Sequence, residues 1–227
     1  MNRDSDARQR ILDAATEVFV DKGLSGARMQ EIADRAQINK AMLHYYFTSK
    51  EKLYETVVST AVQGIMERIQ GVLKGKDVPT EKRFLLLVDT YLDSLSKSPH
   101  LPRLVVMDLL AGGETVMKAF QQAQDKTGFV GARPAIALLQ AGIREGVIHE
   151  LDPKHTLIST IGMVAFSFLA EPLLSSVLQI EDRKAGQFFA DRRRNVMEIL
   201  QHGVLKEQAS TRVSTIPRED KWEKWLG

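Results

Sequence analysis

The sequence predicts an all-α protein with an N-terminal three-helix domain that contains a helix-turn-helix, followed by a larger C-terminal helical bundle. Apolar residues recur at helical spacing along the chain. We find no convincing run of alternating β-branched residues flanked by hairpin turns. Near the N-terminus, two short helical segments are separated by a break of only three residues, which is the outline of a helix-turn-helix.

The first predicted helix supplies the core of the N-terminal domain. Gly23 follows Lys22 and is expected to end this helix, since glycine is a common C-terminal stop. The inner stripe of the helix has helical spacing and consists of Ile11, Ala15, Val18 and Phe19.

The second helix is short and precedes the break at residues 37–39. It is expected to run from about Met29 to Ala36, with an inner face formed by Ile32, Ala33 and Ala36. Isolated helices of this length are marginal in water, so the first helix must provide the apolar surface that the short helices lack.

The third helix is predicted to begin at Lys40. The side chain of Asn39 can accept a hydrogen bond from a free amide of the first turn and so cap the helix. The helix should be short, because Thr48 and Ser49 offer a new cap and Lys50 begins a longer helix.

Four ring-bearing residues follow one another in this third helix. A helix turns about 100° per residue, so four consecutive side chains cannot all face one core. We assign Phe47, together with Leu43, to the core, and we place His44 and Tyr45 outside. Tyr46 is expected at the boundary between core and surface, since its ring can pack while its hydroxyl reaches outward.

Composition sets limits on the class of protein. The chain has 227 residues, of which 44% are hydrophobic and 26% charged, as in an ordinary globular protein. The absence of cysteine excludes disulfides, thiolate metal sites and a cysteine nucleophile, and favours a cytoplasmic location. The polar N-terminus MNRDSDARQR predicts no signal peptide. Residues 1–56 contain nine Lys/Arg and nine Asp/Glu, so bulk charge gives no argument for nucleic acid.

The rest of the chain divides by its glycines and prolines. We predict a domain at residues 1–56, a second at 57–208 and a tail at 209–227, with a linker near 74–80. Asp152 followed by Pro153 predicts an N-cap and the first helical position. The helices expected after the linker are 81–97, 102–125, 133–145, 153–180 and 186–208.

Residues 156–178 are apolar and long enough to cross a bilayer. Glu171 and Pro172 within this segment argue against a membrane helix, so we expect a helix buried in protein or at a subunit interface. The helices 153–180 and 186–208 are apolar enough to form a four-helix interface between two chains.

The N-terminal segment RILDAATEVFVDKG…MQEIADRAQINKAMLHYYFTSKEKLYETV resembles the DNA-binding domain of the tetracycline-repressor (TetR) family of bacterial transcription regulators. The resemblance covers roughly residues 8–60. Beyond it, only the layout is similar, including HLPRLVVMDLLAGGE and REGVIHELDP. The family implies a homodimeric repressor that binds a palindromic operator on double-stranded DNA. It also implies release by a small-molecule effector bound in the C-terminal domain.

The resemblance also implies a set of DNA contacts. Phosphate contacts are implied for Lys40, Tyr46 and Lys50, and contacts to phosphate or base edges for His44 and Tyr45. The capping residue Asn39 lies in the same surface.

Three positions of this surface depart from the family pattern. Arg28 replaces a usual threonine cap and is either a phosphate contact or a solvated charge. Met42 also replaces threonine and either contacts a thymine methyl or fills a crowded helix surface. Gln37 replaces the usual glycine of the turn, which predicts a strained or altered turn.

Candidate effector contacts come from the C-terminal part. Glu171 in an apolar helix either lines a ligand cavity or has a capped or ion-paired structural role. Arg103 and Asp108 have a similar but weaker case. The apolar candidates for the wall of a largely apolar pocket, each of which could equally belong to the core, are Met107, Phe120 and Phe166.

Other features carry no chemistry. The arginines of ADRRRN, residues 190–195, are expected on a solvated face, and the five histidines are too dispersed for a metal motif. Trp222 and Trp225 are expected to dock on the protein's own surface. The alternatives to a repressor are an architectural or division-linked DNA-binding factor without an inducer, and an enzyme or carrier. No clustered ligands, phosphate-cradling loop or nucleophile elbow supports catalysis.

Overall fold

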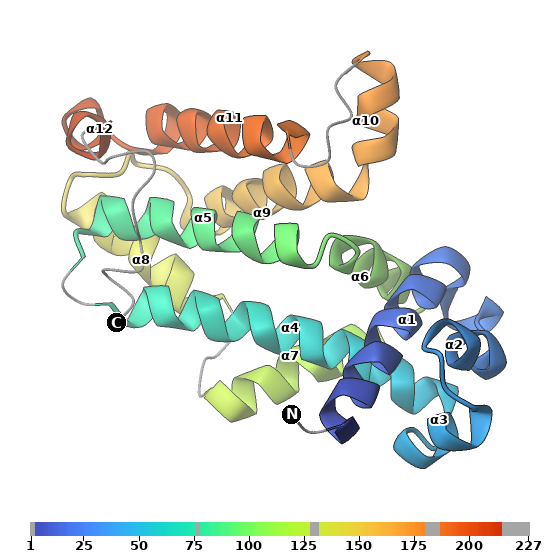
Figure 1. Cartoon of the computed structure of the whole chain (residues 1–227). Coiled ribbons are helices and arrows are strands. Elements are labelled where there is room, and N and C mark those ends of the chain that lie inside the picture. The colour runs from blue at the N-terminus through green and yellow to red at the C-terminus, as the bar shows by residue number, and fades with distance from the viewer. Residues whose placement is uncertain (1–2, 76–77, 128–131, 180–186, 215–227) are drawn as a thin grey trace. The chain divides into compact units, whose positions relative to one another are not determined.

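A computed structural model describes residues 3–75, 78–127, 132–179 and 187–214. Every regular element in these ranges is a helix, and a single isolated antiparallel bridge joins Ile148 to Leu205 (Figure 1). The prediction of an all-α protein is confirmed. The predicted docking of Trp222 and Trp225 lies outside the described residues. The helices are α1 (Arg3–Gly26), α2 (Met29–Arg35), α3 (Lys40–Tyr46), α4 (Lys50–Lys74), α5 (Thr80–Lys97), α6 (Leu101–Leu110), α7 (Glu114–Thr127), α8 (Arg133–Arg144), α9 (Pro153–Leu169), α10 (Glu171–Val177), α11 (Gln187–Val204) and α12 (Glu207–Ser214).

The helices form two compact units, and α4 contributes to both. The N-terminal unit comprises Met1–Gly64 and Ser98–Asp125, and the C-terminal unit comprises Ile65–Lys97 and Lys126–Gly227. The first unit is therefore discontinuous in sequence, because α6 and most of α7 return to the N-terminal helices. The domains predicted from the motifs follow a different division and stay a prediction.

The predicted helix 102–125 is wrong, because the structure has two helices there. Gly112 and Gly113, with φ of 114° and 77°, turn the chain between α6 and α7. Asp108 secures the turn: its Oδ2 accepts a hydrogen bond at 2.8 Å from the amide of Val116 in the first turn of α7. A buried carboxylate with a backbone partner is satisfied, so the structure gives Asp108 a capping role.

The predicted helix 153–180 is also two helices, α9 and α10, with a bend of 78° between them. Pro172 in the first turn of α10 explains the bend, because its ring cannot be accommodated in a continuous helix. Among the described residues, no single helix is long and apolar enough to cross a membrane; only this bent pair meets the length and composition criteria. Asp152 caps α9 as predicted, with Oδ1 accepting from the amides of Lys154 and His155 at 2.9 Å each.

The predicted helix 186–208 likewise breaks, into α11 and α12. The break lies at Leu205, which leaves the helix to pair with Ile148. The amide of His149 donates to the carbonyl of Val204 at 3.0 Å, and the amide of Lys206 donates to that of Val147 at 3.0 Å. These backbone partners replace the helical hydrogen bonds that a continuous helix would have made.

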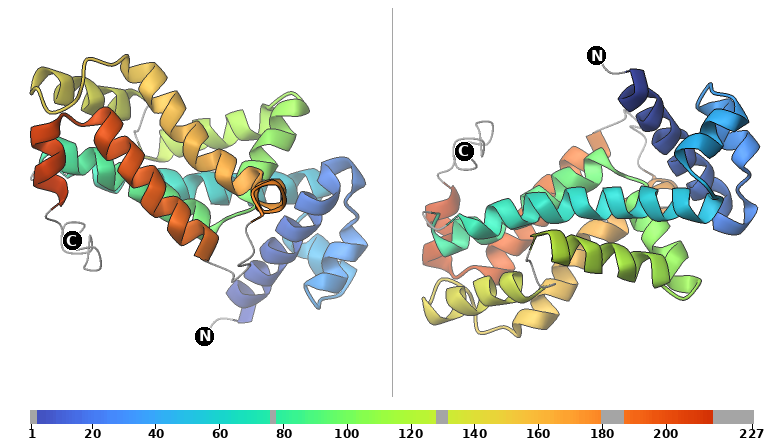
Figure 2. Two further views of the ribbon diagram at one scale, coloured as in Figure 1. Left: turned by 90° about the horizontal axis from the view of Figure 1, so that it is seen from above. Right: turned by 90° about the horizontal axis from the view of Figure 1, so that it is seen from below.

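Helix α5 is the centre of the C-terminal unit. It contacts α8, α9, α11 and α12, and α5, α9 and α11 lie side by side in the views of Figures 1 and 2. Phe84, Leu85, Leu92 and Leu95 of α5 are all at most 3% exposed. A helix surrounded in this way is apolar over most of its circumference.

Two arginines of the ADRRRN segment, which was predicted to form a solvated face, also bind this core. Arg193 forms a two-pronged ion pair with the buried Asp89 of α5, at 2.6 Å (Nε–Oδ1) and 2.5 Å (NH2–Oδ2). Arg192 donates to Ser167 Oγ at 2.7 Å and to the carbonyl of Met163 at 3.0 Å, both on α9. Arg193 and Arg194 are exposed as predicted, Arg192 is half-buried, and Arg194 makes only an exposed contact with Asp191.

Removing the Arg193 side chain should destabilise the protein by about 2–4 kcal/mol, because Asp89 would keep a buried charge without its partner. The measurement is the free energy of unfolding of Arg193→Ala from chemical denaturation. Arg194→Ala is the matched control and should cost less than about 0.5 kcal/mol, since its ion pair is exposed. Equal losses in the two variants would contradict a special role for the Arg193–Asp89 pair.

Candidate nucleic-acid interface

Helices α2 and α3 form the predicted helix-turn-helix and are held by a small apolar core. Ile32 and Ala33 of α2 and Leu43 of α3 are fully buried, and Phe47 is 4% exposed. The predicted stripe of α1 lies in the same core, since α1 contacts α2 and its residues Ile11, Ala15, Val18 and Phe19 are fully buried. The predicted core assignment of Leu43 and Phe47 is confirmed.

Gln37 gives the turn between α2 and α3 its backbone conformation. Its φ is 56°, in the left-handed region that glycine adopts without penalty. Gln37 thus keeps the conformation that glycine would adopt, so of the two predicted alternatives the structure has the strained turn. After Gln37, the amide of Ile38 donates to the carbonyl of Ala33 at 3.0 Å, which closes the turn. Asn39 then caps α3, with its Oδ1 accepting from the amide of Met42 at 2.7 Å.

The outer side of α3 presents a mixed aromatic and cationic surface. Tyr45 is 84% exposed and Met42 is 40% exposed. His44 and Lys40 are exposed as well. The run of four rings thus divides as predicted in geometry, with Phe47 inside and His44 and Tyr45 outside.

Tyr46 lies at the boundary and has a partner that the sequence did not indicate. Its hydroxyl donates a hydrogen bond to Asp4 Oδ1 in the first turn of α1. This hydrogen bond is the main reason that the pKa of Tyr46 lies above its usual value. The rings of Tyr45 and Tyr46 meet edge to face, with centroids 5.5 Å apart.

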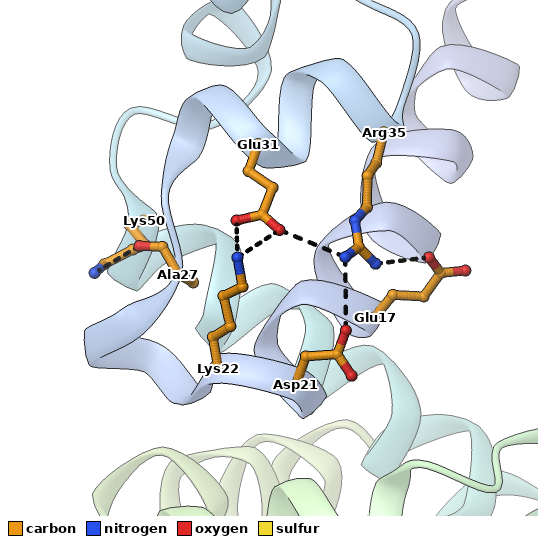
Figure 3. Close-up of polar contacts among 7 residues, drawn as sticks. All are labelled: Glu17, Asp21, Lys22, Ala27, Glu31, Arg35 and Lys50. Atoms are coloured by element: carbon orange, nitrogen blue, oxygen red, sulfur yellow. Dashed lines mark hydrogen bonds and ion pairs between the residues drawn. The ribbon is translucent and has the colours of Figure 1, made fainter.

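Lys50 points to backbone carbonyls at the junction of α1 and α2. Its ammonium donates to the carbonyl of Ala27 at 3.1 Å and to that of Ser25 at 3.3 Å. Figure 3 shows the contact with Ala27. Lysine near the end of a helix satisfies carbonyls that have no intrahelical partner. The structure therefore gives Lys50 a role in closing the first interhelical junction.

An ion-pair network fixes α2 against α1 (Figure 3). Lys22 binds Glu31 at 2.7 Å and 2.8 Å to its two carboxylate oxygens, and this hydrogen-bonded pair lowers the pKa of Glu31. Arg35 reaches Glu31 at 3.4 Å, Glu17 at 3.3 Å and Asp21 at 3.6 Å. The charges of Lys22 and Arg35 are thus compensated within the protein.

Three cations of the N-terminal helices and their junctions form no ion pair with a carboxylate of the described residues. Within the described ranges, no ion pair joins Lys40, Arg28 or Arg8 to a carboxylate. Arg28 precedes α2 and makes no capping hydrogen bond through its side chain. Arg8 lies over the ring of Phe47, with its guanidinium carbon 5.7 Å from the centroid. The bulk charge of residues 1–56 cancels, yet its arrangement leaves free cations beside the exposed rings.

Sequence reasoning missed Asp4 and Arg8 as members of this surface. Asp4 and its partner Tyr46 are 42 positions apart, and no periodicity connects them. The one available signal was the spacing of four residues between Asp4 and Arg8, which places these two side chains on the same face of α1.

The candidate effector residues do not gather in one unit. Arg103, Met107, Asp108 and Phe120 belong to the N-terminal unit, whereas Phe166 and Glu171 belong to the C-terminal unit. Arg103 is exposed and Phe120 is half-buried.

Several of these residues have structural partners instead. Met107 of α6 packs against α1, where a Cβ at Gly23 would lie 3.2 Å from Met107 Cε. Glu171 accepts a hydrogen bond from Ser175 Oγ at 3.0 Å in the first turn of α10. Phe166 is 54% exposed. The structure therefore gives three of the six candidates, Met107, Asp108 and Glu171, contacts in packing or capping.

A helix-turn-helix with buried anchors, an exposed aromatic edge and unpaired cations defines a DNA-binding protein of the helix-turn-helix class. Residues 11–57 match the family model described as bacterial regulatory proteins of the tetR family. The chain is a TetR-family transcriptional regulator.

The proteins that it resembles include one named as a transcriptional activator and others named as transcriptional repressors. It is 26% identical over 202 residues to the transcriptional regulator RutR of Escherichia coli K12, covering 87% of this chain and 90% of RutR. It is 34% identical over 98 residues to the transcriptional activator FasR of Mycolicibacterium smegmatis, covering 43% of this chain and 44% of FasR. The structure of the ketosteroid transcriptional regulator KstR2 of Mycobacterium tuberculosis superposes with a TM-score of 0.70 at 16% identity, covering 88% of this chain and 95% of KstR2, and so shares the fold.

Replacing Gln37 by glycine should stabilise the protein by about 0.5–1 kcal/mol, since the relief of left-handed strain exceeds the added chain entropy of the unfolded state. Chemical denaturation gives the free energy of unfolding. Gln30→Gly is the matched control: Gln30 lies inside α2, so the same substitution should destabilise by about 1 kcal/mol. Two changes of the same sign would show that the turn at Gln37 is not strained.

Proposed function

We propose that this regulator is a homodimeric repressor whose two α3 helices enter successive major grooves of a palindromic operator. A small, largely apolar effector releases it. The observation that carries the proposal is the outer side of α3, where the highly exposed Tyr45 stands beside unpaired cations. An exposed tyrosine on a short helix with a buried opposite side is suited to contact with base edges.

The proposed contacts fall into two groups. Lys40, Arg28 and Arg8 bind phosphates, because their charges have no carboxylate partner within the described part of the chain. Tyr45, His44 and Met42 face the bases, with the Met42 thioether against a thymine methyl. The remaining members of the expected surface support these contacts: Gln37 and Asn39 shape the turn and the cap, and Tyr46 and Lys50 hold α3 and the first junction beside the phosphates.

Exposed glycines within two helices support the proposed dimer. Gly162 of α9 and Gly203 of α11 each have no atom within 4 Å of the place where a Cβ would lie. A glycine inside a helix costs about 1 kcal/mol relative to alanine, so its presence there calls for an explanation. Close approach of a helix from a second chain provides one. Exposed apolar side chains surround these glycines, namely Ile158, Ile161 and Phe166 on α9 and Ile199 on α11.

The effector is proposed to bind to the helical region outside α1–α3. The name of KstR2, a ketosteroid regulator of the same fold, supports an apolar effector of this kind. The residues predicted to contact it stay predictions within their own units: Arg103, Met107, Asp108 and Phe120 in the N-terminal unit, and Phe166 and Glu171 in the C-terminal unit. A thermal-shift screen of apolar compounds, followed by displacement of bound operator DNA, tests this part of the proposal. A compound that raises the melting temperature and releases the DNA is the expected result.

The DNA-binding proposal is tested with the DNA upstream of the regulator's own gene. A palindrome in that region should bind with a dissociation constant below about 1 µM at moderate salt. Absence of any such site, with the protein shown to be folded, would refute it. Transcription from the same promoter with and without the protein distinguishes repression from activation.

Tyr45→Ala and Lys40→Ala should affect DNA binding in different ways. Loss of the exposed ring should change the preferred operator sequence, because a base contact is removed. Loss of Lys40 should weaken binding to all sequences and reduce the salt slope by about one unit, because one phosphate contact is removed. Titrations of selected and random duplexes at several salt concentrations measure both effects. A salt slope unchanged in Lys40→Ala would exclude a phosphate contact there.

Ile161→Glu should convert the dimer into monomers at micromolar concentration, because two carboxylates would face each other across the α9 contact. Sedimentation velocity measures the change. Leu110→Glu is the control, since Leu110 is 84% exposed but lies in the N-terminal unit. Dissociation in both variants, or in neither, would argue against α9 as the dimer surface.

A further inference from the structure

We infer that Asp4 is a positioning residue of the recognition helix, which orients Tyr45 through Tyr46 and raises sequence selectivity while lowering affinity for DNA in general. The inference rests on the proposed function, because it assumes that α3 reads base edges. Its starting point is an acidic side chain in a surface that otherwise collects cations. An exposed carboxylate close to DNA phosphates is repelled by them, so its presence there calls for a compensating role.

The first step is the contact between Asp4 and Tyr46. The Tyr46 hydroxyl donates its one proton to Asp4 Oδ1. In this arrangement the hydroxyl cannot donate to a DNA phosphate at the same time. The ring of Tyr46 is instead held at a fixed position relative to α1.

The second step is the contact of the Tyr46 ring with Tyr45, the side chain that is proposed to contact the bases. The ring planes of Tyr45 and Tyr46 are inclined by 80°, with centroids 5.5 Å apart. Tyr45 is otherwise 84% exposed, so the ring of Tyr46 is the main neighbour that can limit its rotamers. Restricting an exposed aromatic side chain before binding reduces the entropy lost when it meets a base.

The third step is the register of α1. Asp4 and Arg8 are four residues apart and therefore lie on one face of the helix. Asp4 contacts Tyr46, and Arg8 lies over Phe47, the residue that follows Tyr46 in the chain. The first two turns of α1 thus contact the C-terminal end of α3 at two adjacent points. The packing of α1 therefore holds Asp4 next to Tyr46.

The charge and the hydrogen bond of Asp4 have opposite consequences for DNA binding. The charge weakens attraction to every DNA sequence, because it adds repulsion near the phosphates. The hydrogen bond favours the sequences for which the fixed orientation of Tyr45 is correct. Variants that remove one property and keep the other can separate the two.

The test uses the full-length protein, a duplex selected from a random pool by the wild type, and an unrelated duplex of equal length. Three variants are compared with the wild type: Asp4→Ala, Asp4→Asn and Tyr46→Phe. Asparagine keeps a carbonyl acceptor but has no charge. Asp6→Ala is the control, because Asp6 is an exposed acid in the same region of α1 whose ion pair is with Arg10.

Asp4→Ala and Tyr46→Phe should each reduce the ratio of selected to unrelated affinity by about 3- to 10-fold, the equivalent of one hydrogen bond. The double variant should be no worse than either single variant, because both remove the same contact. Asp4→Asn should retain the wild-type ratio. Asp4→Ala, Asp4→Asn and Asp6→Ala should all bind the unrelated duplex about two- to threefold more tightly, because each removes one negative charge.

An unchanged ratio in Asp4→Ala would overturn the inference, and so would a ratio in Asp4→Asn that falls as far as in Asp4→Ala. Losses that add in the double variant would also overturn it. Melting temperatures of all variants show whether a change in ratio reflects unfolding. If the wild type itself selects no sequence from the pool, the proposed function fails, and this result is distinct from the loss of selectivity in a single variant.

Discussion

The burial of Leu43 and Phe47 against α1 is the interaction on which the N-terminal unit depends. Helix α3 has seven residues, too few for stability in isolation, so packing must hold it in place. One side of this short helix faces the core, and the other side is left for DNA. The hydrogen bonds of Lys50 at the α1–α2 junction and the ion pairs between α1 and α2 stabilise the same core, because they hold together the two helices whose apolar residues share it with α3.

The cations of the N-terminal helices fall into two groups, those in ion pairs with carboxylates and those that form no such pair among the described residues. Three carboxylates, Glu17 and Asp21 of α1 and Glu31 of α2, compensate Lys22 and Arg35, which lie where these two helices meet. Arg28, which precedes α2, and Lys40, which begins α3, form no ion pair with a carboxylate of the described residues. Exposed pairs of this kind contribute little to stability, so their main effect is on the field that DNA encounters. A protein with balanced composition can therefore still present a cationic surface.

Local rules predicted much of this unit, and long-range pairing explains what they missed. The cap at Asn39 and the inward positions of Ile11 and Leu43 follow from neighbours within four residues, whereas the unusual backbone of Gln37 was expected only from the resemblance to the family. Asp89–Arg193, which joins residues 104 apart, leaves no periodic trace in the sequence, and neither does Asp4–Tyr46. The helix boundary at Leu205 was missed because the bridge to Ile148 outweighs helix propensity. The boundary at Gly112 had a local signal that was not used, since two consecutive glycines disfavour a helix interior.

The glycine at position 23 has a consequence for how the chain acquires its structure. Because Gly23 has no side chain, Met107 can pack against α1, and α6 becomes part of the N-terminal unit. The residues between, Ile65–Lys97, belong to the other unit. During synthesis the N-terminal helices therefore emerge well before their last partner. The 33 residues Ile65–Lys97 of the other unit and then the segment Ser98–Asp125 must be made before their packing is complete. Folding of this unit is therefore coupled to synthesis of a segment that is not its own.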